Sequence, residues 1–151
     1  RCWGAPRDDK LRPATGPAAQ FSLHFTVASA LLHDGFELRD SQPDALQQPD
    51  RLALAARIDV VADEGRRTGS VLGRTGLSAL LHDGRVIELE RAQPSGSPQH
   101  PVDAAAQRAK LLDCVAFSGL PIGAAKVDAL IAAVQTLESA ADVRVLIGGL
   151  A

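Results

Sequence analysis

Residues 19–32 read AQFSLHFTVASALL, and this stretch predicts the first long helix of the chain. Its apolar side chains recur at i, i+4, i+7 and i+11, the spacing of one helical face: Phe21, Phe25, Ala28 and Leu32. Gly35 follows the last of them, at the position where helices often end in a left-handed conformation. We therefore expect a helix that begins near Gln20 and ends at Gly35.

A tight hairpin is predicted farther along the chain. Residues 77–82 and 85–91 are apolar or alternating runs, and the dipeptide Asp83-Gly84 separates them. This dipeptide is a strong hairpin signal, because Gly84 can adopt the positive φ that a type I′ turn demands.

The remaining regular elements are expected to be mostly helical. Asp50 and Asp103 are candidate N-caps of two of the helices. Helices are predicted over residues 52–56, 104–117 and 123–139, and a strand over residues 58–62. Because helices mix with an antiparallel hairpin without regular strand–helix alternation, we predict an α+β fold. Its form would be a two-layer sandwich, with helices packed on one face of a mainly antiparallel sheet.

The two ends of the chain differ in composition. Residues 1–19 are rich in Pro, Gly, Arg and Asp and lack a hydrophobic period, which predicts a linker or extended lead-in. Residues 20–151 are then the domain itself, with polar loops expected at 36–49 and 63–76. The chain contains no methionine, so we expect a processed product or a piece of a longer protein.

Charge and cysteine content exclude several classes of function. Lys and Arg number 16 and Asp and Glu number 18, a net charge of −2 that gives no reason to expect nucleic acid or an anionic membrane as partner. No apolar run approaches the roughly 18 residues of a membrane span. The two cysteines, Cys2 and Cys114, lie too far apart in sequence to suggest a disulfide framework, so a cytoplasmic location is expected.

No stand-alone active site is evident from motifs. The sequence lacks a phosphate-binding glycine loop, a nucleophile elbow and a paired-cysteine motif. The four histidines lack metal-ligand spacing, so neither a metal site nor a cofactor is expected. Ser22 and His24, at the start of the first predicted helix, allow two interpretations. Either Ser22 caps the helix and His24 packs or faces solvent, or both line a site where the helix N-terminus favours a carboxylate.

Several segments resemble the MmgE/PrpD family, which includes 2-methylcitrate dehydratase. Residues 19–32 are similar to the family pattern A-x-F-S-L-[PQ]-[YF]-x-V-A-x-A-L-L. Further matches, in the family's order, are the lead-in Pro13 and Thr15, the weaker stretch 49–60, the hairpin tripeptide Asp83-Gly84-Arg85, the loop 96–102 and Lys110. On their shared order and spacing, the chain is identified as a member of the family, similar to its C-terminal domain from Arg12 onward.

The resemblance implies a domain of a larger enzyme. Family members are homodimers of the cytosol or mitochondrion, with a large helical N-terminal domain and a small α+β C-terminal domain. They dehydrate, decarboxylate or epimerise small polycarboxylates with acid–base side chains and no iron–sulfur cluster. The expected function is therefore that of the C-terminal domain of a polycarboxylate lyase or isomerase, contributing cleft wall and dimer packing. The alternative is a stand-alone, non-catalytic module for small-molecule binding or assembly.

The resemblance also implies where substrate would lie. By position in the family pattern, Ser22, His24 and Phe25 are candidate substrate-binding residues, and no catalytic residue is expected in this chain. Relatives often have Tyr where this chain has Phe25, and Pro or Gln where it has His24. His100 stands where the family loop has Asn. These departures leave the substrate open.

The isolated chain of 151 residues is expected not to turn over 2-methylcitrate or cis-aconitate. The reason is that the acid–base motifs of the family are absent from it. Substrate loss and product formation can be followed by NMR with the purified chain. Turnover above the rate in protein-free buffer would contradict this prediction.

Overall fold

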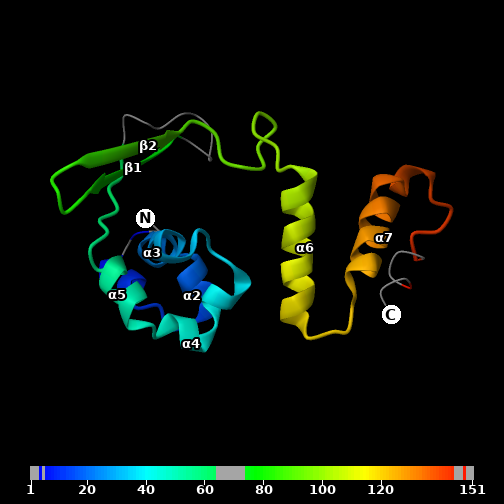
Figure 1. Ribbon diagram of the computed structural model, residues 1–151, viewed down its shortest axis with the longest axis horizontal. Helices are drawn as coiled ribbons and strands as arrows, with labels where there is room; N and C mark the ends of the chain where they lie inside the picture. Colours follow the sequence, from blue (N-terminus) through cyan, green and yellow to red (C-terminus); the bar gives the residue numbers. More distant parts are fainter. Residues whose placement is uncertain (1–3, 5, 64–73, 145–147, 149–151) are drawn as a thin grey trace. The chain divides into compact units, whose positions relative to one another are not determined.

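The computed structural model describes residues 4, 6–63, 74–144 and 148 (Figure 1). The chain divides into two compact units. The first comprises Arg1–Val61 and Arg108–Ala151, and the second comprises Ala62–Gln107. The helices are α1 Arg7–Leu11, α2 Gly16–Gln20, α3 Leu23–His33, η1 Leu38–Ser41, α4 Pro43–Leu46, α5 Pro49–Ala55, α6 Ala104–Ser118, α7 Ala124–Gln135 and η3 Leu137–Ser139, and the strands are β1 Thr75–Leu80 and β2 Val86–Arg91.

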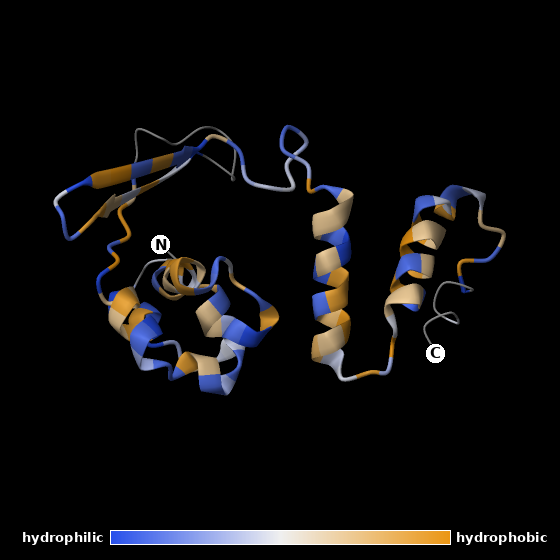
Figure 2. Cartoon of the chain, viewed as in Figure 1, coloured by the Kyte–Doolittle hydropathy of each residue, from blue (hydrophilic) through white to orange (hydrophobic). Residues whose placement is uncertain are grey.

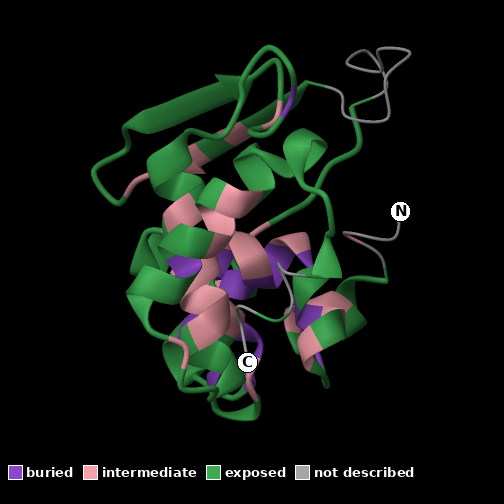
Figure 3. Cartoon of the chain, turned by 90° about the vertical axis from the view of Figure 1, so that its right-hand side faces the viewer, coloured by how far each residue is buried: buried purple, intermediate pink, exposed green. Residues whose placement is uncertain are grey.

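Helix α3 is the centre of the first unit. It packs against α1, α2 and α5, and Phe25 on its buried face is fully enclosed. Phe25 forms the core with Ala19 and Leu46, and the partly buried Phe36 and Leu52 pack against this cluster. Figure 3 shows the buried residues gathered among these helices, whereas the two strands are exposed or half-buried. The predicted apolar face of α3 is thus a core face at Phe25 and Ala28. The prediction is wrong at Phe21 and Leu32, which are exposed, and the helix begins at Leu23 rather than near Gln20.

A buried ion pair ties η1 to α5. Arg51 Nη2 donates to Asp40 Oδ1 at 2.8 Å, and both side chains are almost fully enclosed. The other carboxylate oxygen, Asp40 Oδ2, accepts the backbone N–H of Glu37 at 2.7 Å. The Arg51 guanidinium also lies 5.2 Å from the centre of the Phe25 ring, within cation–π range. The Arg51–Asp40 pair therefore fixes the segment around η1, and its guanidinium also covers the ring of Phe25.

The N-terminus of α3 has the predicted cap. Ser22 Oγ accepts the backbone N–H of Phe25 at 3.1 Å, which satisfies one of the unpaired donors of the first turn. At the other end the prediction is wrong by one residue. Asp34, with φ 59°, takes the left-handed conformation expected of Gly35. A short polar side chain tolerates this conformation better than most.

The second unit contains the predicted hairpin. Strands β1 and β2 pair antiparallel, with Leu77 opposite Leu89 and Ala79 opposite Ile87. Gly84 has φ 85°, the positive value that the turn demanded. Polar and apolar residues alternate along the strands (Figure 2), as expected of a sheet with one apolar face. The α+β class is therefore confirmed, whereas packing of helices on one sheet face stays a prediction.

Two segments expected to lack regular structure are helical. Residues 7–11 and 16–20 form α1 and α2, so an extended lead-in is the wrong description there. The expected loop over 36–49 contains η1 and α4. Pro17, near the start of α2, and Pro43, at the first position of α4, suit helix starts, because proline lacks the N–H that would have no partner there.

Other expectations are corrected in detail. The predicted strand over 58–62 is absent from the described residues, because no neighbouring strand pairs with this alternating stretch. Helix α5 begins at Pro49 after Gln48, so Asp50 lies inside it rather than capping it. Asp103 does cap α6, since its Oδ1 accepts the Ala106 N–H at 2.7 Å. The long last helix is α7 followed by the short η3. Most of the loop expected at 63–76 lies outside the described residues.

Phe25→Ala is expected to lower the free energy of unfolding by about 3–5 kcal/mol, because it empties the centre of the core. Phe21→Ala is the matched control. Its ring is 50% exposed, so we expect a loss of about 1 kcal/mol or less. Urea unfolding followed by circular dichroism measures both. Similar losses in the two variants would show that Phe25 is not the core anchor.

Candidate functional site

The three residues proposed from sequence lie together where α3 begins. Ser22 is the N-cap, and His24 and Phe25 follow in the first turn. All three are enclosed, with exposed fractions of 0%, 1% and 0%. The structure therefore brings the candidates together, but it places their side chains beneath the surface of the described chain. A ligand that approaches this turn would therefore first contact the groups around these three side chains.

Helix α1 is joined to this turn by two hydrogen bonds. Ser22 Oγ donates to the carbonyl of Lys10 at 2.6 Å while it accepts the Phe25 N–H. In return, Lys10 Nζ donates to the carbonyl of Phe21 at 2.7 Å. The interpretation that Ser22 caps the helix is confirmed. Because its hydroxyl is already used as donor and acceptor, Ser22 positions the turn.

Two backbone N–H groups lack an acceptor in the described chain at the N-terminal end of α3. Among the described residues, the N–H groups of Leu23 and His24 have no hydrogen-bond acceptor. They are the first two residues of the helix, where the N–H groups are unpaired and the helix dipole is positive. Lys10 adds a full positive charge beside them. The turn is therefore an electropositive site whose chemistry suits a carboxylate.

The imidazole of His24 is the titratable side chain among the three candidates. Its Nδ1 is enclosed and has no hydrogen-bond partner among the described residues. Burial holds the pKa of His24 below the usual 6.5, and the positive charges of Arg7 and Lys10 lower it further. Asp59 acts in the opposite direction. In the folded chain the ring is thus biased toward its neutral form, with one ring nitrogen able to accept a proton.

Arg7 and Asp59 form an exposed ion pair whose two charges shift the pKa of His24 in opposite directions. Arg7 Nη2 lies 3.4 Å from Asp59 Oδ1 and donates to the carbonyl of Ala56 at 3.0 Å. Both side chains are largely exposed, so this pair is screened by solvent and weakly held. The contacts join α1 to the chain just after α5.

Sequence reasoning missed Arg7, Lys10 and Asp59 as site residues. Arg7 and Lys10 lie outside the segments that carried the family resemblance, and Asp59 lies in its weaker stretch, 49–60. The signal in the sequence was faint. Residues 7–11 read RDDKL, with acidic residues in the first turn and Lys10 in the last, as a short helix prefers.

The described part of the chain shows neither a metal-binding cluster nor a helix that could span a membrane. It contains no cluster of three or more His, Cys, Asp or Glu side chains placed to hold a metal ion. Of the helices described, none combines the length and the apolar character needed to cross a bilayer.

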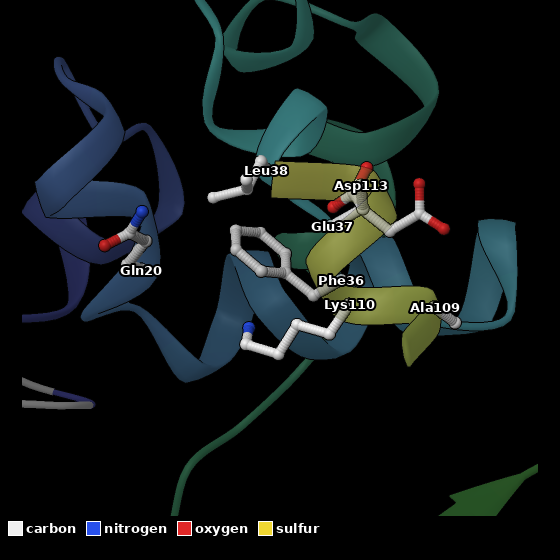
Figure 4. Close-up of a pocket in the computed structure, with 7 residues that line it drawn as sticks. All are labelled: Gln20, Phe36, Glu37, Leu38, Ala109, Lys110 and Asp113. Atoms are coloured by element: carbon white, nitrogen blue, oxygen red, sulfur yellow. The ribbon is translucent and has the colours of Figure 1, made fainter. Parts of the chain in front are cut away.

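A hollow lies elsewhere in the first unit, away from the α3 turn (Figure 4). It is open, with a volume of about 650 Å³, and is lined by Gln20, Phe36, Glu37, Leu38, Ala109, Lys110 and Asp113. None of the three candidate residues lines it. The cation Lys110 lies in a lining that also holds the carboxylates of Glu37 and Asp113, and a matched substitution at Lys110 tests whether an anion binds there.

A comparison with models of protein families gives one match. The model of the MmgE/PrpD C-terminal domain matches residues 3–139, which include every helix and strand described from α1 to η3. No curated protein matches the chain significantly. Because the matched region is a C-terminal domain, proteins of this family carry an N-terminal domain before it.

The buried His24 is expected to make folding sensitive to mild acid. Its pKa is lower in the folded chain than the usual 6.5 of an unfolded chain. Above pH 6.5 both states hold a neutral ring, so its contribution to stability is complete. As the pH falls through 6.5, the unfolded chain binds the proton first and stability is lost. Unfolding midpoints between about pH 7.5 and about pH 5.5 measure this loss, above the range where carboxylates titrate.

His24→Gln should reduce this loss, because an amide cannot be protonated there. His100→Gln is the control, since His100 is exposed. An identical pH dependence in the wild-type chain and in His24→Gln would contradict the assignment.

Proposed function

Because the chain belongs to the MmgE/PrpD family, we propose that it is the C-terminal domain of a polycarboxylate lyase or isomerase and forms one wall of the substrate cleft. The observation that carries the proposal is the electropositive first turn of α3. Two open N–H groups, of Leu23 and His24, lie there beside the ammonium of Lys10. A substrate carboxylate would satisfy both.

The binding energies available at this turn favour a substrate that carries several carboxylates, one of which binds here. A helix N-terminus contributes about 0.3–1 kcal/mol to a nearby negative charge at an exposed site and up to about 2 kcal/mol when partly buried. Charge-assisted hydrogen bonds are roughly twice as strong as neutral ones. These contributions hold one carboxylate weakly. A substrate with further carboxylates would gain the rest of its affinity from the opposite wall of the cleft.

The three candidate residues have distinct parts in this proposal. Ser22 fixes the turn through its two hydrogen bonds, and Phe25 anchors the turn to the core. His24 offers its open N–H and an imidazole enclosed beside it. We therefore propose that Ser22 and Phe25 support substrate binding through the backbone of the turn, and that His24 lies nearest to the ligand.

The reaction would proceed by proton abstraction next to a carboxylate, followed by loss of water or CO₂ or by reprotonation. The acid and base would come from the N-terminal domain. The α3 turn would fix the carboxylate and stabilise the negative charge that builds up on it. Phe25 carries no hydroxyl, so it supplies neither a hydrogen bond nor a proton to the substrate.

We also propose that the domain includes α1 and α2 in addition to residues 20–151. Ala19 of α2 is fully buried in the core, and Lys10 of α1 holds the α3 turn. Pairing into a homodimer and a cytoplasmic location are further proposals. They rest on the family and on the low number of cysteines.

Lys10→Met is expected to weaken binding of tricarballylate roughly five- to tenfold, by removing the positive charge at the turn. This tricarboxylate has no hydroxyl to lose, so it stays unchanged during a titration. Chemical shifts of the Leu23 and His24 amides can be followed by NMR as the ligand is added. The thermal midpoint of each variant shows that it remains folded.

Lys110→Met is the matched control, because it removes the same charge from the hollow of Figure 4. Its affinity for tricarballylate should stay within about twofold of the wild-type chain. A loss of affinity in Lys110→Met with none in Lys10→Met would place the anion in that hollow and overturn the proposed site.

A further inference from the structure

We infer that binding of a dicarboxylate at the first turn of α3 is coupled to the uptake of one proton from solvent, and that His24 is the group that takes up this proton. The inference rests on the proposed function, because it concerns the same turn. It adds a property that the family assignment does not contain, since relatives often have Pro or Gln at this position.

Helix geometry places the imidazole beside the open donors. Side chains in an α-helix lean toward its N-terminus, and His24 is the second residue of α3. Its ring is therefore close to the N–H groups of Leu23 and His24 itself. Nδ1 is enclosed without a partner in the part of the chain that the structure describes. A buried polar atom without a partner carries a cost, and a ligand oxygen beside the ring could remove that cost.

The charges around the ring explain why it is neutral without a ligand. The charges of Arg7 and Lys10 on α1 lower the pKa of the ring, and the charge of Asp59 in the segment after α5 raises it. On α5 itself, Arg51 is engaged by Asp40, and α2 contains no charged residue. Burial, two cations and the positive end of α3 thus oppose a charged imidazole, and Asp59 favours one.

A dicarboxylate reverses this balance. Its two negative charges would face the ring, Lys10 and the helix end together, and an opposite charge within about 4–6 Å favours the protonated ring. The proton comes from solvent and is added to an imidazole nitrogen, and no other bond changes. The bound state would then hold an imidazolium against a carboxylate. Affinity must accordingly increase as the pH falls, because proton uptake and ligand binding are linked.

The experiment measures the affinity of the chain for fumarate at about pH 8 and about pH 6. Both carboxyls of fumarate stay ionised between these values, so a change in affinity arises from the protein. We expect the wild-type chain to bind fumarate roughly tenfold more tightly at the lower pH. In His24→Gln the ratio of the two affinities should fall to near one. His33→Gln, the same change at the far end of α3, should keep the wild-type ratio.

The ring signals of the histidines, followed by NMR in the wild-type chain, give a second readout that needs no variant. With fumarate bound, the His24 signals should titrate at higher pH than without it. The signals of His33, His82 and His100 should not move. Amide shifts of Leu23 and His24 with an unchanged His24 titration would overturn the inference and leave the proposed site standing. No amide shifts at this turn would overturn both.

Discussion

Arg51 and Asp40 meet away from water at 2.8 Å, and much of the first unit is arranged around this contact. The carboxylate also holds the Glu37 N–H, and the guanidinium lies over Phe25, whose ring meets the edge of Phe36 at a centroid distance of 6.5 Å. A buried ion pair adds little net stability, but removal of one partner leaves an uncompensated charge at a cost of about 3–5 kcal/mol. The arrangement around Phe25 is therefore kept or lost as a whole.

The site depends on this core through one turn of helix. Phe25 stands three residues after Ser22, and its N–H completes the cap on which the direction of the first turn depends. The short helices α1 and α4 could not form alone, because helices of so few residues are unstable in water. They persist because α1 binds the α3 turn and Leu46 of α4 joins the core. Core packing and site geometry are thus set by the same residues.

The sequence predicted what local rules determine. The apolar spacing that includes Phe25 and Ala28 indicated α3, Ser22 its cap, and Asp83-Gly84 the hairpin turn, and the structure confirms each. These features depend on neighbours within a few residues. The family pattern, rather than a local rule, pointed to Ser22, His24 and Phe25 as the candidate site.

Local rules failed where distant contacts decide. Arg7 meets Ala56 and Asp59 about fifty positions away in sequence, and no motif connects them. Residues 58–62 alternate like a strand but find no strand to pair with in the described chain. Asp34 replaced Gly35 as the left-handed residue because two adjacent residues both tolerate that conformation. The electropositive surroundings of His24 were hidden in sequence for the same reason.

The double hydrogen bond of Ser22 limits which residues can replace it. At most helix starts Asp is as good an N-cap as Ser, because only an acceptor is needed. Here the same oxygen must also donate to the carbonyl of Lys10. An ionised carboxylate has no proton to give and would face that carbonyl with like charge. Substitution at this position is therefore restricted to side chains that can both donate and accept a hydrogen bond. This set of residues is smaller than the set that caps helices in general.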